Sequence, residues 1–293
     1  MKKWMSSEWV QQSVFVGPVV IAFIIVMVLP FALGIYYSFS SWNGVSSSAS
    51  WVGLQNFKTI FTKDPDFGRS FLFTARFTIG VVIISNLLGF LLAYVLSKPL
   101  KSRNMLRTIF FMPNVLGGLL LGFIWQFIFI QSLPAIGKAT NLWLFNLSWL
   151  GTESTAYWGL VIVSVWQGAG YLMVIYIAGL TNVPSDLLEA AEIDGAKSRQ
   201  ILRHVIFPLI MPAVTVCLFL SISWTFKSFD VNYSLTQGGP YKSTESVAMN
   251  IYFEAFKFNR YGLGTAKAFI FFIIVTVITM IQVSMTKKRE VEM

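Results

Sequence analysis

Long apolar stretches alternate with short polar and charged segments along the whole chain. About 20 apolar residues are enough for a helix to cross the hydrocarbon core of a membrane. Because lipid offers no partners to backbone amides and carbonyls, such stretches are expected to be helical. The sequence therefore predicts an all-α, polytopic membrane protein in which residues 1–293 form a single transmembrane domain. Its six predicted spans are residues 14–37, 74–96, 107–130, 157–180, 209–229 and 263–286.

The composition agrees with this pattern. Hydrophobic residues make up 55% of the chain and charged residues 12%, whereas about a quarter of a soluble domain is charged. The net charge of +9 would suggest nucleic-acid binding in a soluble protein. Here the basic residues lie in short segments between the spans, so they are better explained by orientation in the membrane.

The distribution of basic residues predicts that orientation. Segment 97–106 contains Lys98, Lys101 and Arg103 and no acidic residue, whereas segment 131–156 has Lys138 as its one basic residue. Short loops rich in lysine and arginine stay in the cytoplasm, so the first segment is predicted to be cytoplasmic and the second external. Six spans then place both termini in the cytoplasm. The basic residues near the two ends agree with this: Lys2, Lys3, Lys287, Lys288 and Arg289.

The sequence contains no pattern typical of an enzyme. Nothing matches the phosphate-binding loop G-x-x-x-x-G-K-S/T or the zinc-binding H-E-x-x-H motif. The single cysteine, Cys217, excludes an internal disulfide, and the single histidine, His204, lacks partners at metal-ligand spacing. We therefore expect no catalytic residue, no metal and no resident cofactor.

Segment 182–208, between the fourth and fifth spans, is too regular to be a simple linker. Ser185 or Asp186 is predicted to cap a helix, with Glu189 completing a capping box. Gly195 permits the left-handed turn that ends a helix, and a second short helix then leads to the fifth span. The segment is predicted to be a helix–glycine–helix hairpin on the cytoplasmic side. A solvated loop is the alternative on these grounds.

This hairpin resembles the EAA loop of ABC importer permeases, whose pattern is E-A-A, three residues, G, nine residues and I-x-L-P. The spacing matches throughout, and two apolar replacements occur near its end. The matching residues are Glu189, Ala190, Ala191, Gly195, Val205, Phe207 and Pro208. Other stretches resemble the carbohydrate branch of the same family, which includes maltose- and glycerol-phosphate-type permeases. They are Gly53–Phe57, Phe111–Pro113, Gly122–Trp125, Phe226–Asp230 and Leu235–Pro240.

The resemblance implies a type I ABC importer permease fold in a bacterial cytoplasmic membrane, and import of a di- or oligosaccharide. It also implies partners: a second permease, two ATP-binding subunits that would bind ATP and Mg²⁺, and an external solute-binding protein. The EAA helix would be the coupling helix that contacts the ATPase. An ion-coupled secondary transporter is the main alternative. That class places acidic residues in mid-span, and here Asp230 alone lies near a span, at its end.

Polar residues inside the spans are candidates for the substrate path. Gln167 and Tyr171 are four residues apart and so share a helix face. The candidate residues are Trp166, Gln167, Tyr171, Gln126 and Asp230. Glutamine and asparagine also pin helices together, which is the alternative for Gln126, Gln167 and Asn86. Lys227 and Asp230 could equally form a local ion pair. The identity of the sugar is not encoded in any of these patterns.

Overall fold

The computed structural model describes residues 8–288, with side chains from residue 13 onward. Lys2, Lys3 and Arg289, on which part of the predicted orientation rests, lie outside these residues. The chain forms two compact units. The first unit runs to Pro65 and includes Ile251–Phe272, and the second contains Asp66–Asn250 and the residues from Ile273 onward. The described residues are helical apart from loops and one isolated bridge between Ser40 and Trp51.

Among residues 8–288, five continuous helical stretches are long and apolar enough to cross a membrane. A sixth span is obtained if the pair Ser198–Leu209 and Met211–Phe226, bent by 70°, is counted as one. The all-α prediction with about six spans is therefore confirmed at this level. The five stretches are Ser13–Ser38, Pro65–Leu96 (α4), Gly118–Thr140, Glu153–Thr181 (α8) and Tyr261–Lys287 (α15).

The first unit begins with the span formed by α1 (Glu8–Phe23), a π-helical segment (Ile24–Val28) and α2 (Leu29–Ser38). It continues with α3 (Gln55–Lys63). The side chain of Asn56 in α3 donates hydrogen bonds to the carbonyls of Ser38 (2.9 Å) and Ser40 (2.8 Å). These bonds satisfy carbonyl groups that the end of α2 leaves without helical partners.

A buried ion cluster completes the first unit. Lys267, in α15, is fully buried, and its Nζ lies 2.6 Å from Asp64 Oδ2 and 2.5 Å from Glu254 Oε2. Arg260 contacts the other oxygen of Glu254 at 2.6 Å. Glu254 belongs to the π-helical segment Phe253–Lys257, which follows α14 (Val247–Tyr252). We call Lys267, Asp64, Glu254 and Arg260 the ion cluster. Sequence analysis did not identify it.

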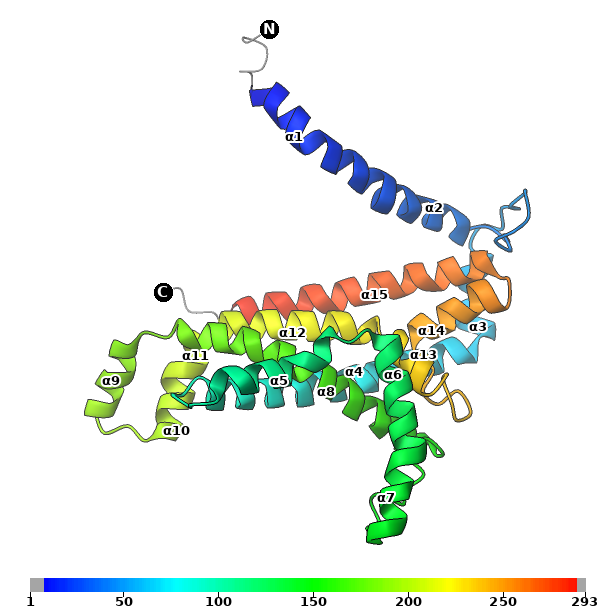
Figure 1. Cartoon of the computed structure of the whole chain (residues 1–293). Helices are drawn as coiled ribbons and strands as arrows, with labels where there is room; N and C mark the ends of the chain where they lie inside the picture. The colour runs from blue at the N-terminus through cyan, green and yellow to red at the C-terminus, as the bar shows by residue number, and fades with distance from the viewer. Residues whose placement is uncertain (1–7, 289–293) are drawn as a thin grey trace. The chain divides into compact units, whose positions relative to one another are not determined.

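The second unit is built around α4, α8 and α12 (Met211–Phe226), with α5 (Arg103–Val115) packed along α8 (Figure 1). Two buried apolar clusters fill the space between these helices. One contains Phe77, Leu121 and Leu160, and the other contains Ala93, Leu172 and Cys217. Cys217 is thus a packing residue.

Asn86 ties three of these helices together. Its Nδ2 donates to Ser221 Oγ of α12 (3.0 Å), and its Oδ1 accepts from the Tyr176 hydroxyl of α8 (2.8 Å). Asn86 itself belongs to α4. A polar side chain whose donor and acceptor both bond to neighbouring helices joins those helices and does not face a ligand. Of the two roles left open for Asn86, the structure supports the structural one.

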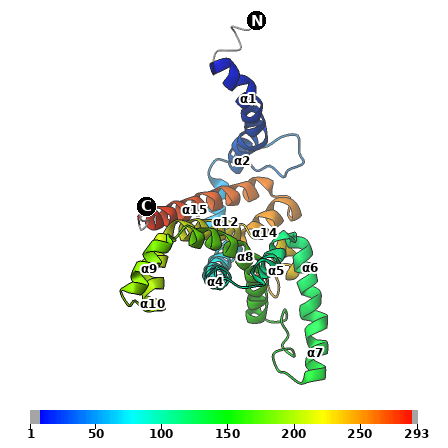
Figure 2. The ribbon, with the colours of Figure 1, turned by 60° about the vertical axis from the view of Figure 1, so that its left-hand side comes forward.

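The structure differs from the prediction at the third span. Residues 107–130 do not form one helix, because α5 ends at Val115 and α6 (Gly118–Phe127) starts after a break. Leu116 and Gly117 are extended, with ψ of 131° and 139°. From the break, α6 runs on through a π-helical segment (Ile128–Ser132) into α7 (Leu133–Thr140), and both turn away from α5 (Figures 1 and 2).

Backbone that leaves the helix at membrane depth needs other hydrogen-bond partners. At this break the partner is Gln167 of α8, whose Nε2 donates to the Leu116 carbonyl at 3.1 Å. The hydropathy of the stretch is continuous, so the apolar pattern alone predicts no interruption. Pro113 and the pair Gly117–Gly118 are the local signals that permit it.

Candidate functional site

A short helix after α12 packs against α6. This helix, α13 (Asp230–Leu235), places Asp230 against Gly118 and Ser234 against Gly122. One turn further along α6, Gln126 Nε2 donates to the Leu235 carbonyl at 3.1 Å. A side chain at Gly122 would overlap Ser234, so this close approach requires glycine. Gln126, predicted to lie on the substrate path, instead joins two helices.

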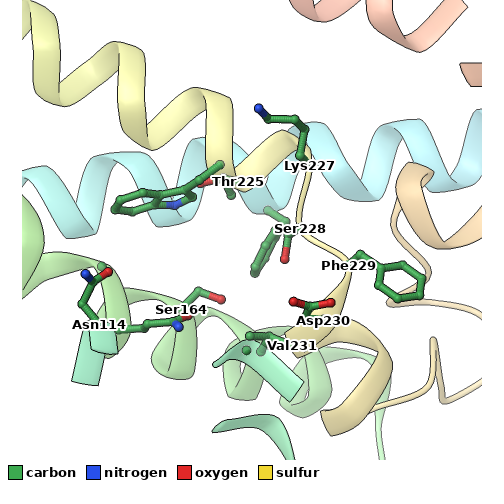
Figure 3. A pocket seen from close by; sticks show the side chains of 13 residues that line it. Asn114, Ser164, Thr225, Lys227, Ser228, Phe229, Asp230 and Val231 are labelled. Atoms are coloured by element: carbon green, nitrogen blue, oxygen red, sulfur yellow. The ribbon is translucent and has the colours of Figure 1, made fainter. Parts of the chain in front are cut away.

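The break in the third span and the α6–α13 contact leave a cavity, which we call the inner cavity. Its volume is about 330 Å³, at the lower end of the range for small-molecule sites. Six helices (α4, α5, α6, α8, α12 and α13) and the loop between α12 and α13 contribute to its wall (Figure 3). The lining residues are Phe77, Asn114, Gly118, Ser164, Gln167, Gly168, Trp224, Thr225, Lys227, Ser228, Phe229, Asp230 and Val231.

Several polar side chains of this wall have hydrogen-bonding capacity left over. Figure 3 shows Asn114, Ser164 and Asp230 turned toward the same space, from α5, α8 and α13. No hydrogen bond or ion pair is formed by these three side chains within residues 8–288. Lys227 extends away from Asp230 (Figure 3), and no ion pair joins the two. The local ion pair considered from the sequence is therefore not formed.

Trp224 contributes aromatic surface to the inner cavity, together with Phe77 and Phe229. Its ring lies directly on α8 at Gly168, where a Cβ atom would overlap it. The ring of Tyr171 is 6.1 Å from that of Trp224 but does not line the cavity. Trp166 is 42% exposed, and its ring pairs with that of Trp125 at 5.4 Å. Gln167 lines the cavity, whereas Trp166 and Tyr171 do not; Trp166 and Gln167 are consecutive residues of a helix and point in different directions.

The structure thus brings together two of the five predicted path residues, Gln167 and Asp230. Sequence analysis missed Asn114, Ser164 and Trp224. Ser164 and Gln167 are three residues apart on α8, and Trp224 and Lys227 are three apart at the end of α12. Ser164 could have been predicted as the residue one helical turn before Gln167, and Trp224 as the residue one turn before Lys227. Asn114 depends on the break in the third span and has no such signal.

The predicted hairpin lies at the other end of α8. It consists of α9 (Ser185–Ile193), a turn in which Gly195 has φ of +78°, and α10 (Ser198–Ile201). The second arm continues as a π-helical segment (Leu202–Ile206) and α11 (Phe207–Leu209). The helix–glycine–helix form therefore agrees with the prediction. The capping box does not, because no side chain caps α9 and the residue before it is Pro184.

The two arms of the hairpin are held by apolar contacts. Ile201, Ile206 and Ile210 are buried, and Leu188, Ala191 and Val205 pack against them. Ala191 therefore faces inward and Ala190 outward, so the two alanines do not form one face. Pro208 is half-buried, whereas Glu189 and Phe207 are exposed. Ile193 is 86% exposed, an unusual position for an apolar side chain on a helix that has a buried face available.

No group of three histidine, cysteine, aspartate or glutamate residues that would fit a metal ion occurs in the part of the chain that the structure describes. The cavity offers hydrogen-bonding groups, two charged side chains and aromatic rings, and the chemistry that this set supports is reversible binding of a polar molecule.

Comparisons with known proteins agree with this description. The profile of the family described as "Binding-protein-dependent transport system inner membrane component" matches residues 85–290. The chain is 48% identical to the "Probable starch degradation products transport system permease protein AmyD" of Thermoanaerobacterium thermosulfurigenes, covering 95% of this chain and 94% of the relative. It is 34% identical to the "Multiple sugar-binding transport system permease protein MsmF" of Streptococcus mutans serotype c, over 89% and 90% of the two chains.

A solved structure has the same fold. It is a chain of a bacterial ABC transporter described as involved in the import of the acidic polysaccharide alginate. The TM-score is 0.82, with 19% sequence identity and 98% of each chain covered. At this identity the likeness establishes the fold, including the permease architecture of an ABC importer.

Proposed function

Because the chain belongs to the family of binding-protein-dependent transport system inner membrane components, we propose that it passes an oligosaccharide through its inner cavity. As a member of this family it is a multi-pass protein of the inner membrane. It is a non-catalytic permease subunit of an ABC importer and needs no cofactor of its own. The alternative of an ion-coupled secondary transporter is thereby excluded.

One observation carries the choice of substrate: hydrogen-bonding side chains that have no partner among the described residues surround a cavity that also contains a tryptophan ring. Asn114, Ser164 and Asp230 offer donors and acceptors, and Trp224 offers an apolar face. A sugar presents hydroxyl groups at its edge and C–H groups on its faces, so it can use both. The names of the two relatives, one for starch degradation products and one for multiple sugars, support a neutral oligosaccharide.

We further infer the orientation of the chain in the membrane. The basic segment 97–106 follows α4, and the hairpin follows α8. The positive-inside rule places both on the cytoplasmic side, and six spans then place both termini there. The start of α4, the start of α8 and the loop after α13 lie on the external side.

The hairpin is proposed to couple this subunit to a separate ATPase. Its outer face presents Glu189, Ala190 and Ile193, which are exposed and therefore available to a partner subunit. The complete importer is proposed to contain a second, different permease, two ATPase subunits that bind ATP and Mg²⁺, and an external solute-binding protein. Each partner shifts the transporter between inward-open and outward-open states by its difference in affinity for the two.

The coupling role is tested with three variants of the hairpin. Gly195→Pro cannot adopt the positive φ of this turn, whereas Gly195→Asn can, because asparagine tolerates the left-handed region. We expect Gly195→Pro and Glu189→Lys to insert normally and to lose ATP-driven uptake of maltotriose in proteoliposomes. Gly195→Asn is expected to retain it. Normal uptake with normal co-purification of the ATPase by Glu189→Lys would contradict the coupling role.

The energy source and the substrate class are tested in the same proteoliposomes. Maltotriose uptake is expected to stop when the phosphate-binding lysine of the ATPase subunit is replaced. It is expected to continue when ionophores collapse the ion gradients. Uptake that follows the ion gradient, or uptake of no sugar under any condition, would contradict the proposal.

A further inference from the structure

A second cavity lies at the other end of α4 and α8 from the hairpin. We call it the outer cavity. Because α8 has 29 residues and rises 1.5 Å per residue, the hairpin and the outer cavity are about 40 Å apart. The volume of the outer cavity is about 770 Å³, more than twice that of the inner cavity. Its wall contains Asp66, Arg69, Ser70, Phe73, Arg76, Glu153, Tyr157, Trp158, Tyr241, Lys242 and Glu245, among others.

The charges of this wall balance. Three are basic (Arg69, Arg76 and Lys242) and three are acidic (Asp66, Glu153 and Glu245). Such a wall attracts neither anions nor cations strongly, but it presents both donors and acceptors. That combination suits the hydroxyl groups of a neutral sugar, which donate and accept at the same time.

Three aromatic side chains add flat apolar surface. Tyr157 and Trp158 start α8, with their ring centroids 5.5 Å apart. Tyr241 lies in the loop between α13 and α14 and is 93% exposed. Trp158 is 48% exposed. Large exposed rings beside polar groups are costly to leave in water unless they have an occupant, and they are typical of binding surfaces.

Parts of the wall are held rigid. Glu245 is 4% exposed, and its Oε1 accepts hydrogen bonds from Asn250 Nδ2 (2.6 Å) and Ser70 Oγ (3.4 Å). The Tyr157 hydroxyl donates to the Arg76 carbonyl at 3.1 Å, and the guanidinium of Arg76 lies 5.9 Å from the Tyr157 ring. A preorganised wall of this kind loses little entropy when a ligand binds.

The outer and inner cavities are neighbours along α4. Phe73 lines the outer cavity, and Phe77, one turn further along α4, lines the inner cavity. Their rings are stacked, with centroids 5.6 Å apart and planes at 12°. The stacked pair therefore links the walls of the two cavities, which follow one another along α4.

We propose that the outer cavity is an entry subsite that binds pyranose units of a neutral oligosaccharide before they pass Phe73 and Phe77 into the inner cavity. The external location of this subsite rests on the orientation proposed above. Trp158 and Tyr241 stack on the faces of the sugar rings. Arg76 and Glu153 bind the hydroxyls.

The test uses the intact transporter in nanodiscs, without solute-binding protein, and maltopentaose as the probe. Saturation-transfer NMR measures binding to the wild type and to four variants: Trp158→Ala, Tyr241→Ala, the inner-cavity variant Asn114→Ala and the control Trp143→Ala. Trp143 is 74% exposed and lies outside both cavities. Saturable binding to the wild type is expected, about tenfold weaker in Trp158→Ala and Tyr241→Ala, as for loss of one ring contact. Trp143→Ala is expected to bind as the wild type does, and any weakening in Asn114→Ala, whose residue lines the inner cavity, is expected to be smaller than in Trp158→Ala and Tyr241→Ala.

Three outcomes would overturn the entry subsite. One is the absence of saturable binding to a wild-type transporter whose maltotriose uptake is normal, a result that leaves the proposed function intact. Another is binding that is weakened by Asn114→Ala but not by Trp158→Ala or Tyr241→Ala, which would place the sugar in the inner cavity alone. The third is a result in which Trp158→Ala and Tyr241→Ala bind the sugar normally but need a higher concentration of binding protein to stimulate ATP hydrolysis. This result would make the outer cavity a docking surface for that protein. Tyr241 is almost fully exposed, so its variant is expected to fold.

Discussion

The ion cluster and the inner cavity both contain charged side chains, but these are paired in the ion cluster and not paired with each other in the inner cavity. In the ion cluster, Lys267 is fully buried and each of its two carboxylate partners lies within 2.6 Å. In the inner cavity, Lys227 and Asp230 are exposed to the cavity and do not pair with each other. One group of charges is satisfied within the protein, and the other is left available.

This difference separates structural from functional polar groups. Removing a charge from water costs several kcal/mol, and only close partners offset that cost. A fully buried lysine held by two carboxylates is not accessible to a ligand. A hydrogen-bonding side chain that faces a water-filled cavity keeps its hydration until a ligand replaces it. In a membrane protein, pairing is therefore more informative than the mere presence of a polar residue in a span.

The largest expected effect comes from Lys267→Met. The substitution leaves Asp64 and Glu254 buried without the lysine, and breaking a buried ion pair costs about 3–5 kcal/mol. We expect a sharp fall in yield and in the thermal unfolding temperature of the detergent-purified protein. Lys227→Met is the matched control, because Lys227 forms no ion pair within residues 8–288. It is expected to unfold as the wild type does. Equal stability of the two variants would show that the ion pairs of Lys267 do not stabilise the fold.

The next effect concerns the close contact that shapes the inner cavity. Gly122→Val would push its side chain into Ser234, and overpacking of this kind costs about 1–3 kcal/mol. We expect a lower unfolding temperature together with reduced maltotriose uptake, because α13 must move. Gly117→Ala is the control, since a Cβ at Gly117 meets no atom within 4 Å. If Gly122→Val had no effect on either measurement, α6 and α13 would not be in contact in the working protein.

The smallest effect on stability is expected from Asn114→Ala. Asn114 forms no hydrogen bond within the described residues, so its removal is expected to leave the unfolding temperature unchanged. The loss of one hydrogen bond to the sugar, about 0.5–1.5 kcal/mol, is expected to slow maltotriose uptake about two- to tenfold. Asn104→Ala, an exposed position on the same helix, serves as control. A less stable but fully active Asn114→Ala protein would show that Asn114 is structural.

The apolar pattern was sufficient to predict most of the helices. The predicted span 157–180 corresponds to α8, which runs from Glu153 to Thr181, and 263–286 corresponds to α15, Tyr261–Lys287. Gly195 was predicted to end a helix, and it does so with a positive φ. These features depend on residues close together in the sequence, where hydrophobicity and backbone sterics decide the outcome.

The features that sequence analysis missed depend on residues far apart. The break at Leu116 is stabilised by Gln167, a partner from another span. The role of Lys267 could not be assigned without Asp64 and Glu254. No regular spacing in the sequence connects these partners with the residues that they contact. For the same reason the aromatic surface of the cavity was assigned to Trp166, when packing between α8 and α12 provides it from Trp224.

The central claim, that the inner cavity holds the transported sugar, is tested most directly by labelling a cysteine in its wall. The chain has a single native cysteine, Cys217, which is fully buried, so background labelling is expected to be low. In Ser164→Cys the new thiol faces the cavity (Figure 3). Its reaction with a small thiol reagent is measured in the reconstituted transporter during turnover with sugar-loaded binding protein. Thr140→Cys, at the exposed end of α7, is the control.

We predict that transported sugar slows labelling of Ser164→Cys severalfold and leaves labelling of Thr140→Cys unchanged. Unprotected labelling of Ser164→Cys in a transporter that still imports maltotriose would contradict the claim and place the substrate elsewhere.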